Sequence, residues 1–303
     1  MKTKLLFAAL AAFSAAGAAE NPLWMRHCAI SPDGNTIAFC YKGDIYTVPS
    51  TGGNARQLTT NQSYDTNPIW SPDGQQIAFA SARQGSLDIY LISKEGGTPK
   101  RLTTHSGNEL PVTFTDNGHL LFRASVMPDA TDLSFPSSQF PQVYEVNTQG
   151  GRPVLYSSFP MEDISVAKDG TTLLYHDQKG YEDPWRKHHT SSITRDIWLS
   201  KEDVNHQRTY QKLTSFNGED RNPVWSGDNQ SFYYLSEKEG SFNVFKRNLD
   251  GSNEVQLTHH TQHPVRFLSA AQNGLLCYGY DGEIYTVKEG QSPQKVNIRI
   301  VTD

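Results

Sequence analysis

The fold is decided by the stretch Ser63-Tyr-Asp-Thr-Asn-Pro-Ile-Trp-Ser-Pro-Asp-Gly-Gln-Gln-Ile-Ala-Phe-Ala-Ser81, with Asp88-Ile-Tyr-Leu-Ile92 and Lys100-Arg-Leu-Thr103 after it. Its two apolar runs are separated by Pro72-Asp-Gly74. An Asp-Gly pair between such runs supplies the positive φ angles of a tight hairpin turn, so we expect two adjacent antiparallel strands. The two shorter segments predict a third and a fourth strand. One copy of the pattern therefore indicates a four-stranded antiparallel unit.

The pattern recurs in six copies along the chain. Tight turns between first and second strands stand at residues 31–34, 71–74, 115–118, 167–170, 226–229 and 271–274. The third-strand signal recurs in step with them, from Asp44-Ile-Tyr46 to Glu283-Ile-Tyr285, and a Leu-Thr pair marks most of the fourth strands. A repeat of about forty residues with four strands is typical of a β-propeller, in which each sheet is one blade. The sequence thus predicts an all-β, six-bladed propeller of four-stranded antiparallel blades.

The strand count also predicts how the ring closes. Blade one has four strands of its own from about Arg26, and the run from Gln294 to Ile300 completes blade six. Because no strand is left over, we expect closure without strand swapping, held by side-chain packing alone. We expect the first strand of every blade to line a central channel.

The beginning of the chain predicts export. Lys2 and Lys4 precede an apolar run over residues 5–16, and Ala16-Gly-Ala18 offers small residues for cleavage. The alternative, a membrane-spanning helix, needs roughly twenty apolar residues, more than this run provides. We therefore expect a signal peptide at residues 1–18, a propeller domain at 19–303, and a periplasmic or otherwise exported location, with no later membrane span.

Composition narrows the class of partner. The hydrophobic fraction is 36% and the mean hydropathy −0.58, which fits blades packed around a solvated channel. The net charge is −5 and there is no basic block, so we expect no nucleic-acid partner. Cys28 and Cys40 flank the first hairpin turn, so a disulfide between them is sterically possible. We favour three buried free thiols instead, with Cys277 as the third.

Two blades carry insertions between their second and third strands. They span residues 125–141 in blade three and residues 176–194 in blade four, and the second is rich in charged and aromatic side chains. In a propeller this connection and the connection to the next blade open on the same face. We therefore expect both insertions on one rim, where loops on a rigid scaffold often carry binding sites.

The repeats Ser-Pro-Asp-Gly-x-x-Ile-Ala-Phe, Asp-Ile-Tyr and Leu-Thr resemble those of TolB proteins and tricorn proteases. The segment Gly180 to Trp198 is more specific, because it resembles the fourth-blade segment of bacterial tricorn protease homologues. Members of that family continue into a second propeller, a PDZ domain and a serine peptidase core that cleaves short peptides. Their catalytic serine, histidine and acidic residues have no matching positions among these 303 residues.

The resemblance implies a non-catalytic propeller domain of an exported tricorn-type serine peptidase, which gates or channels peptide substrates and scaffolds the peptidase core. Its partners would be peptides and the PDZ and peptidase domains of the same or a companion chain. A free-standing, TolB-like periplasmic adaptor that binds proteins is the alternative. A propeller enzyme such as a lyase would need acidic or histidine residues that converge on the channel, which the sequence does not locate.

No catalytic or cofactor motif stands in the sequence. We found no Gly-x-Ser-x-Gly, His-Glu-x-x-His, Cys-x-x-Cys, Walker or dinucleotide-binding pattern, so we expect no catalytic residue and no cofactor. The pairs His188-His189 and His259-His260, the latter followed by His263, would permit a metal site across two loops of one rim. We favour solvated histidines and expect no metal.

The blade-four insertion supplies the candidate peptide-binding residues: Asp183, Trp185, Arg186, Lys187, His188 and His189. A carboxylate binds an amino terminus and a guanidinium binds a carboxylate in bidentate fashion, so this loop can capture a peptide end. In the alternative, the charges pair within the loop and Trp185 packs against blade four. Asp33, Asp73 and Asp169 are expected to form turns.

Overall fold

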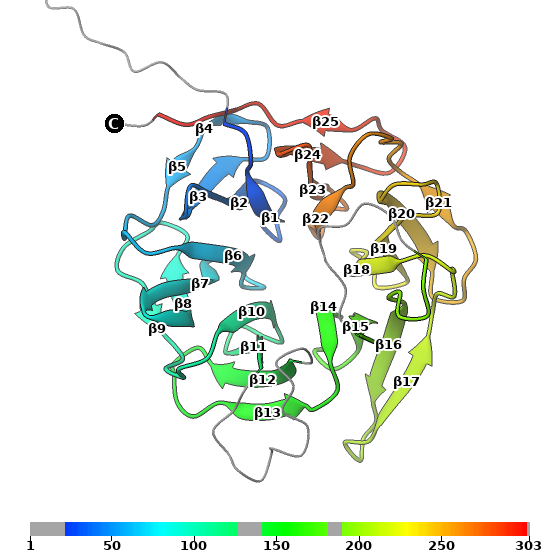
Figure 1. The fold of residues 1–303 in the computed structure, drawn as a ribbon, viewed down its shortest axis with the longest axis horizontal. Helices are drawn as coiled ribbons and strands as arrows, with labels where there is room; N and C mark the ends of the chain where they lie inside the picture. Colours follow the sequence, from blue (N-terminus) through cyan, green and yellow to red (C-terminus); the bar gives the residue numbers. More distant parts are fainter. Residues whose placement is uncertain (1–21, 126–140, 181–189, 302–303) are drawn as a thin grey trace, which may run out of the picture.

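A computed structural model describes residues 22–125, 141–180 and 190–301. Six four-stranded antiparallel sheets stand around a central axis as the blades of a propeller (Figure 1). Each blade takes its four strands from one continuous part of the chain, so the predicted fold and the absence of strand swapping between blades are confirmed. The described residues contain no helix long and apolar enough to span a membrane.

The strands of each blade follow one another from the axis outwards. Blade one holds β1 (Arg26–Ile30), β2 (Thr36–Tyr41), β3 (Asp44–Pro49) and β5 (Arg56–Gln57). Blade two holds β6 (Asp65–Trp70), β7 (Gln76–Gln84), β8 (Ser86–Ser93) and β9 (Lys100–Arg101). Blade three holds β10 (Glu109–Phe114), β11 (His119–Ala124), β12 (Gln142–Asn147) and β13 (Val154–Ser157).

The second half of the ring repeats this order. Blade four holds β14 (Met161–Val166), β15 (Leu173–Asp177), β16 (Ile197–Glu202) and β17 (Arg208–Lys212). Blade five holds β18 (Asp220–Trp225), β19 (Ser231–Ser236), β20 (Asn243–Asn248) and β21 (Val255–Gln256). Blade six holds β22 (Arg266–Ala270), β23 (Leu276–Tyr280), β24 (Glu283–Val287) and β25 (Gln294–Lys295).

The Leu-Thr pairs dock the fourth strand onto the third. In blade one, Leu58 N donates to Ile45 O at 2.8 Å, and Ile45 N donates to the Thr59 hydroxyl at 3.0 Å. The same threonine contact recurs in three other blades, at 2.9 Å each, between Ile89 and Thr103, Ile197 and Thr214, and Val244 and Thr258. The repeated pair therefore satisfies a buried backbone donor just beyond the end of each of these four outer strands.

The tight turns join first to second strands, as predicted, but with a different geometry. In blade one, Gly34 N donates to Ser31 O at 2.9 Å, and only Gly34 of the Asp-Gly pair has a positive φ, at 80°. Asp33 instead accepts from the Ser31 hydroxyl at 2.5 Å and from Asn35 N at 3.0 Å. The aspartates thus form turns through their side chains, as predicted for Asp33, Asp73 and Asp169.

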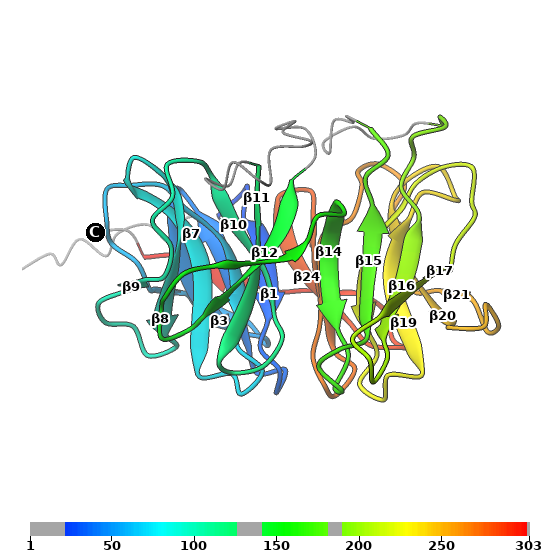
Figure 2. The same cartoon turned by 90° about the horizontal axis from the view of Figure 1, so that it is seen from below.

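The two faces of the ring differ. One face, here called the insertion face, carries the connections between second and third strands together with the connections between blades, as the hydrogen bond from Asp65 N to Gly43 O at 2.7 Å shows. The strand ends that flank both insertions, at Ala124 and Asp177, lie on this face (Figure 2). The opposite face, here called the turn face, carries the Asp-Gly turns.

The prediction that side-chain packing alone closes the ring is wrong. After β25 the chain crosses to the outer edge of blade one, where β26 (Ile298–Arg299) pairs in parallel with β4 (Gly53–Asn54) (Figure 1). Gly53 N donates to Asn297 O at 2.9 Å and Ala55 N donates to Arg299 O at 2.8 Å. Alternation predicts that a run is a strand but not which edge it joins, which explains the error.

The three cysteines are free and buried, as we favoured. Cys40 pairs in register with Arg26 rather than with Cys28, so the two thiols are not placed opposite each other. Cys28 and Cys277 instead belong to the hydrophobic cluster between blades one and six, which also contains Ile298 and Ile300.

Candidate functional site: the central channel

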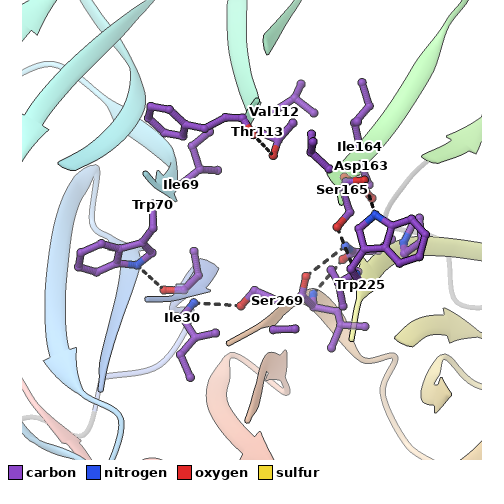
Figure 3. A pocket seen from close by; sticks show the side chains of 18 of the residues that line it. Ile30, Ile69, Trp70, Val112, Thr113, Asp163, Ile164, Ser165, Trp225 and Ser269 are labelled. Carbon is purple, nitrogen blue, oxygen red and sulfur yellow. Dashed lines mark hydrogen bonds between the residues drawn. The ribbon is translucent and has the colours of Figure 1, made fainter. Parts of the chain in front are cut away.

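A central channel of about 910 Å³ runs through the ring, and the first strands of all six blades line it. The predicted role of the first strands is therefore confirmed. Its wall combines aliphatic side chains such as Ile69, Val112 and Ile164 with small hydroxyl side chains such as Ser165 and Ser269 (Figure 3).

The first strands share a frame of seven residues that ends at the first residue of the turn. Asp65-Thr-Asn-Pro-Ile-Trp-Ser71 and Asp220-Arg-Asn-Pro-Val-Trp-Ser226 are its clearest copies, and they stand on opposite sides of the ring (Figure 1). Beside the third position, the register of pairing with the second strand shifts in all six blades. Each inner strand therefore carries a β-bulge, a feature that re-aims side chains.

The third position of this frame has a left-handed backbone in five of the six blades. The residues are His27 (φ 50°), Asn67 (φ 53°), Asp163 (φ 47°), Asn222 (φ 50°) and Phe267 (φ 59°). Pro111 occupies the position in blade three, where its ring holds φ near −65°. All six residues line the channel, and we call them the bulge ring. Left-handed backbone in residues other than glycine is strained and is often found at functional sites.

Contacts between blades fix the bulge ring. The Asn222 side chain accepts from Leu268 N at 2.8 Å and donates to Leu268 O at 3.1 Å, which ties blade five to blade six. The rings of His27 and Phe267 contact each other with their centroids 4.6 Å apart. Burial lowers the pKa of His27 to about 4, and the neighbouring charge of Arg26 acts in the same direction. His27 is therefore neutral at pH 7.

Two equivalent tryptophans tie neighbouring first strands together further along the channel. Trp70 Nε1 donates to Ala29 O at 2.9 Å, and Trp225 Nε1 donates to Ser165 O at 3.0 Å (Figure 3). Each bond satisfies a carbonyl of the preceding blade. Together they hold the wall at the level between the bulge ring and the turn face.

A charged cluster lies behind the bulge ring at blades three to five. Glu162 is its centre: Arg123 donates to Oε1, while His176 Nε2 lies 3.1 Å from Oε2 and Arg195 Nε 3.8 Å from it. Arg195 also pairs with Glu219 at 2.8 Å, where both side chains are buried. Burial alone would raise the pKa of Glu162, but Arg123, His176 and Arg195 outweigh it and hold this pKa well below its usual range.

The candidate residues of the blade-four insertion, Asp183, Trp185, Arg186, Lys187, His188 and His189, lie outside the described residues. The described base of the insertion is held by Lys179, which donates to Asp196 and lies 3.5 Å from Asp177. The insertion therefore starts and ends on a fixed base at the insertion face.

Two of the histidines singled out in blades five and six, His260 and His263, have local partners. His260 stacks on Tyr280 with centroids 3.7 Å apart, and its Nε2 lies 3.0 Å from the Tyr278 hydroxyl. His263 lies 3.4 Å from Asp281. Within the described ranges, no three histidine, cysteine or acidic residues are grouped as a metal site would require.

The bulge ring is the part of the site that sequence reasoning missed. The Asn-Pro pairs at Asn67 and Asn222 were a usable signal, because asparagine tolerates left-handed backbone and the two copies share one register. Phe267 gives no such signal, because phenylalanine does not favour that conformation; histidine tolerates it better, but His27 is not part of an Asn-Pro pair.

Comparison with protein families matches residues 22–292 to the tricorn protease N-terminal beta propeller domain. The chain belongs to this family.

Individual relatives agree with the family. The chain is 26% identical over 276 residues to tricorn protease homolog 1 of Streptomyces coelicolor and 25% identical over 278 residues to the tricorn protease homolog of Saccharolobus solfataricus. Each match covers 89% of this chain but 24% of the relative, so the chain spans about a quarter of their length.

Solved structures show the same fold. A crystal structure of the tricorn protease superposes with a TM-score of 0.76 at 22% identity, over 93% of this chain and 27% of that one. TolB from Acinetobacter baumannii superposes with a TM-score of 0.61 at 15% identity, over 91% of this chain and 66% of that one. At such identities the likeness establishes the architecture alone.

Proposed function

We propose that this chain is the non-catalytic propeller of an exported tricorn-type serine peptidase, where it gates or channels peptide substrates and scaffolds the peptidase core. The observation that carries the proposal is the channel itself, lined by the first strands of all six blades in a chain of the tricorn N-terminal propeller family. Export depends on cleavage of the expected signal peptide at residues 1–18.

The channel suits an extended peptide. Its volume of about 910 Å³ is near the upper end of the range typical of ligand pockets. Its wall offers apolar side chains for contact and small polar ones that do not obstruct passage. Charged side chains also line the channel: the cluster around Glu162 lies at one side, and Arg221 and Arg266 line it in blades five and six.

In this proposal the insertion of blade four guards the channel. Asp183, Trp185, Arg186, Lys187, His188 and His189 capture a peptide end at the insertion face, and the peptide then enters the channel. The PDZ and peptidase domains of the same or a companion chain receive it. The propeller supplies a rigid support for those domains and no catalytic group of its own.

An obstruction placed in the wall tests the proposal. Thr113 lines the channel from blade three, so Thr113→Trp narrows it. Thr209→Trp adds the same bulk to exposed β17 on the outer edge of blade four and is the matched control. We expect short peptides to bind the purified chain weakly, in the 10⁻⁴ M range or above, because few contacts offset the entropy lost on association. Calorimetric titration should show binding lost in Thr113→Trp and kept in Thr209→Trp; equal binding by both variants contradicts channel entry.

A further inference from the structure

Asp163 is the charged member of the bulge ring. The other five members are neutral at pH 7: His27, Asn67, Pro111, Asn222 and Phe267. The ring itself therefore presents one carboxylate beside amide, imidazole, proline and phenyl side chains, while Glu162, Arg221 and Arg266, which also line the channel, are not members of the ring.

The carboxylate of Asp163 is open to the channel. Its side chain is 49% exposed, and the ion-pair contact that the described residues give it is with His176 Nδ1 at 3.5 Å. That nitrogen also accepts a hydrogen bond from Asn222 N at 3.3 Å. A ring nitrogen that accepts a proton cannot donate one, so His176 does not neutralise Asp163 in this arrangement. The oxygens of Asp163 are left to accept hydrogen bonds from a ligand.

Arg195, Arg221 and Arg266 also line the channel, so the attraction for a cation is local to the Asp163 carboxylate. Asp163 in blade four and His27 in blade one line the channel from opposite sides of the ring. The His27 ring on that side is neutral at pH 7 and adds no positive charge to the wall. Arg195, which also lies near Asp163, is already paired with Glu219 at 2.8 Å.

We propose that the bulge ring binds a protonated primary amine, with Asp163 as its counter-charge, and that the amine is the amino terminus of a peptide in the channel. This proposal rests on the proposed function, because it takes a peptide as the ligand. An ammonium group has three donors and no acceptor, which matches a carboxylate whose oxygens can accept further hydrogen bonds. Charge-assisted hydrogen bonds of this kind are the stronger ones. The site would orient a peptide by its amino end.

Asparagine occupies the equivalent position in two other blades, and this indicates the substitution that tests the site. Asp163→Asn removes the charge and keeps a residue type that occupies the equivalent left-handed position at Asn67 and Asn222. The fold should therefore tolerate it. Asp250→Asn is the matched control, because it removes the same charge from an outer turn where the side chain accepts from Ser252 N at 2.9 Å.

Three hexapeptides with a dye at the carboxyl end separate the sources of the amine: a free amino terminus without lysine, an acetylated amino terminus without lysine, and an acetylated amino terminus with one lysine. Fluorescence anisotropy with the full chain at low salt should show the first binding about tenfold tighter than the second, equivalent to about 1.4 kcal/mol. Asp163→Asn should reduce this ratio to about one, and Asp250→Asn should leave it unchanged.

The other outcomes distinguish failure of the amine site from failure of peptide binding. If the acetylated lysine peptide binds as tightly as the free peptide, the amine site stands and its assignment to the amino terminus is overturned. If all three peptides bind the unaltered chain equally, the amine site is overturned while peptide binding in the channel stands. If none binds, the proposed function fails as well.

Discussion

The strand that closes the ring gives the sharpest test of the fold. Ile298 lies in the parallel pairing of β26 with β4 and Ile300 follows it; they are 4% and 2% exposed in the cluster between blades one and six. Ile298→Ala removes buried methyl and methylene groups and leaves a cavity at the seam. Such substitutions cost about 2–5 kcal/mol, so we expect a loss of about 3 kcal/mol in the free energy of unfolding.

The location of the loss matters more than its size. If β26 holds the seam, Ile298→Ala should speed amide exchange first in blades one and six, by up to roughly a hundredfold, because opening there costs less than global unfolding. The melting temperature should fall by about 6 °C, at about 2 °C per kcal/mol for a chain of this length. Ile92→Ala in blade two, at 2% exposure, is the matched control and should not affect blade six.

Hydrogen exchange followed by mass spectrometry distinguishes the outcomes. Faster exchange spread evenly over all six blades, or a loss below about 1 kcal/mol, would refute the view that the terminal strand is the seam's main fastening.

Two further predictions follow from buried polar groups. Glu109 is 1% exposed with no hydrogen-bond partner for either carboxylate oxygen among the described residues, and burial raises its pKa from 4.5 to about 7. Because the pKa is higher in the folded state, the free energy of unfolding should fall as pH rises from about 4.5 to 7, and the loss should reach up to about 3 kcal/mol at pH 8. In thermal melts, Glu109→Gln should match the unaltered chain at about pH 4 and should not show this loss at about pH 8. Trp225→Phe should cost about 1 kcal/mol in denaturant unfolding, because it leaves Ser165 O without its donor; no loss would mean that the bond is dispensable.

The number and composition of the blades could be predicted because three landmarks recur in one register. Asp-Gly turns, Asp-Ile-Tyr segments and Leu-Thr pairs each have a local physical cause, and the hydrogen bonds of Thr59 and Asp33 show those causes at work. Their coincidence fixed the strand order without knowledge of any contact between blades.

Contacts between blades could not be predicted from these local patterns. The run from Gln294 to Ile300 alternates in the same way whether it completes blade six or crosses to blade one, so its division into β25 and β26 could not be foreseen. The bulge ring escaped for a related reason, because its members share a backbone conformation and not a residue type.

The strain of the bulge ring argues that its side chains have a role. Left-handed backbone costs a residue other than glycine about 1 kcal/mol or more, less for asparagine and aspartate. Five such positions together approach the net stability of an ordinary domain, and glycine would remove that cost at each. Yet the ring carries His27, Asp163 and Phe267, whose side chains reach into the channel and, for His27 and Phe267, contact each other across a blade boundary. Asn222 can be explained by its bonds to Leu268 alone, but no contact of comparable strength explains Asp163. The exposed carboxylate of Asp163 stands on strained backbone and faces the channel, so it is the feature of this propeller that a bound ligand would best explain.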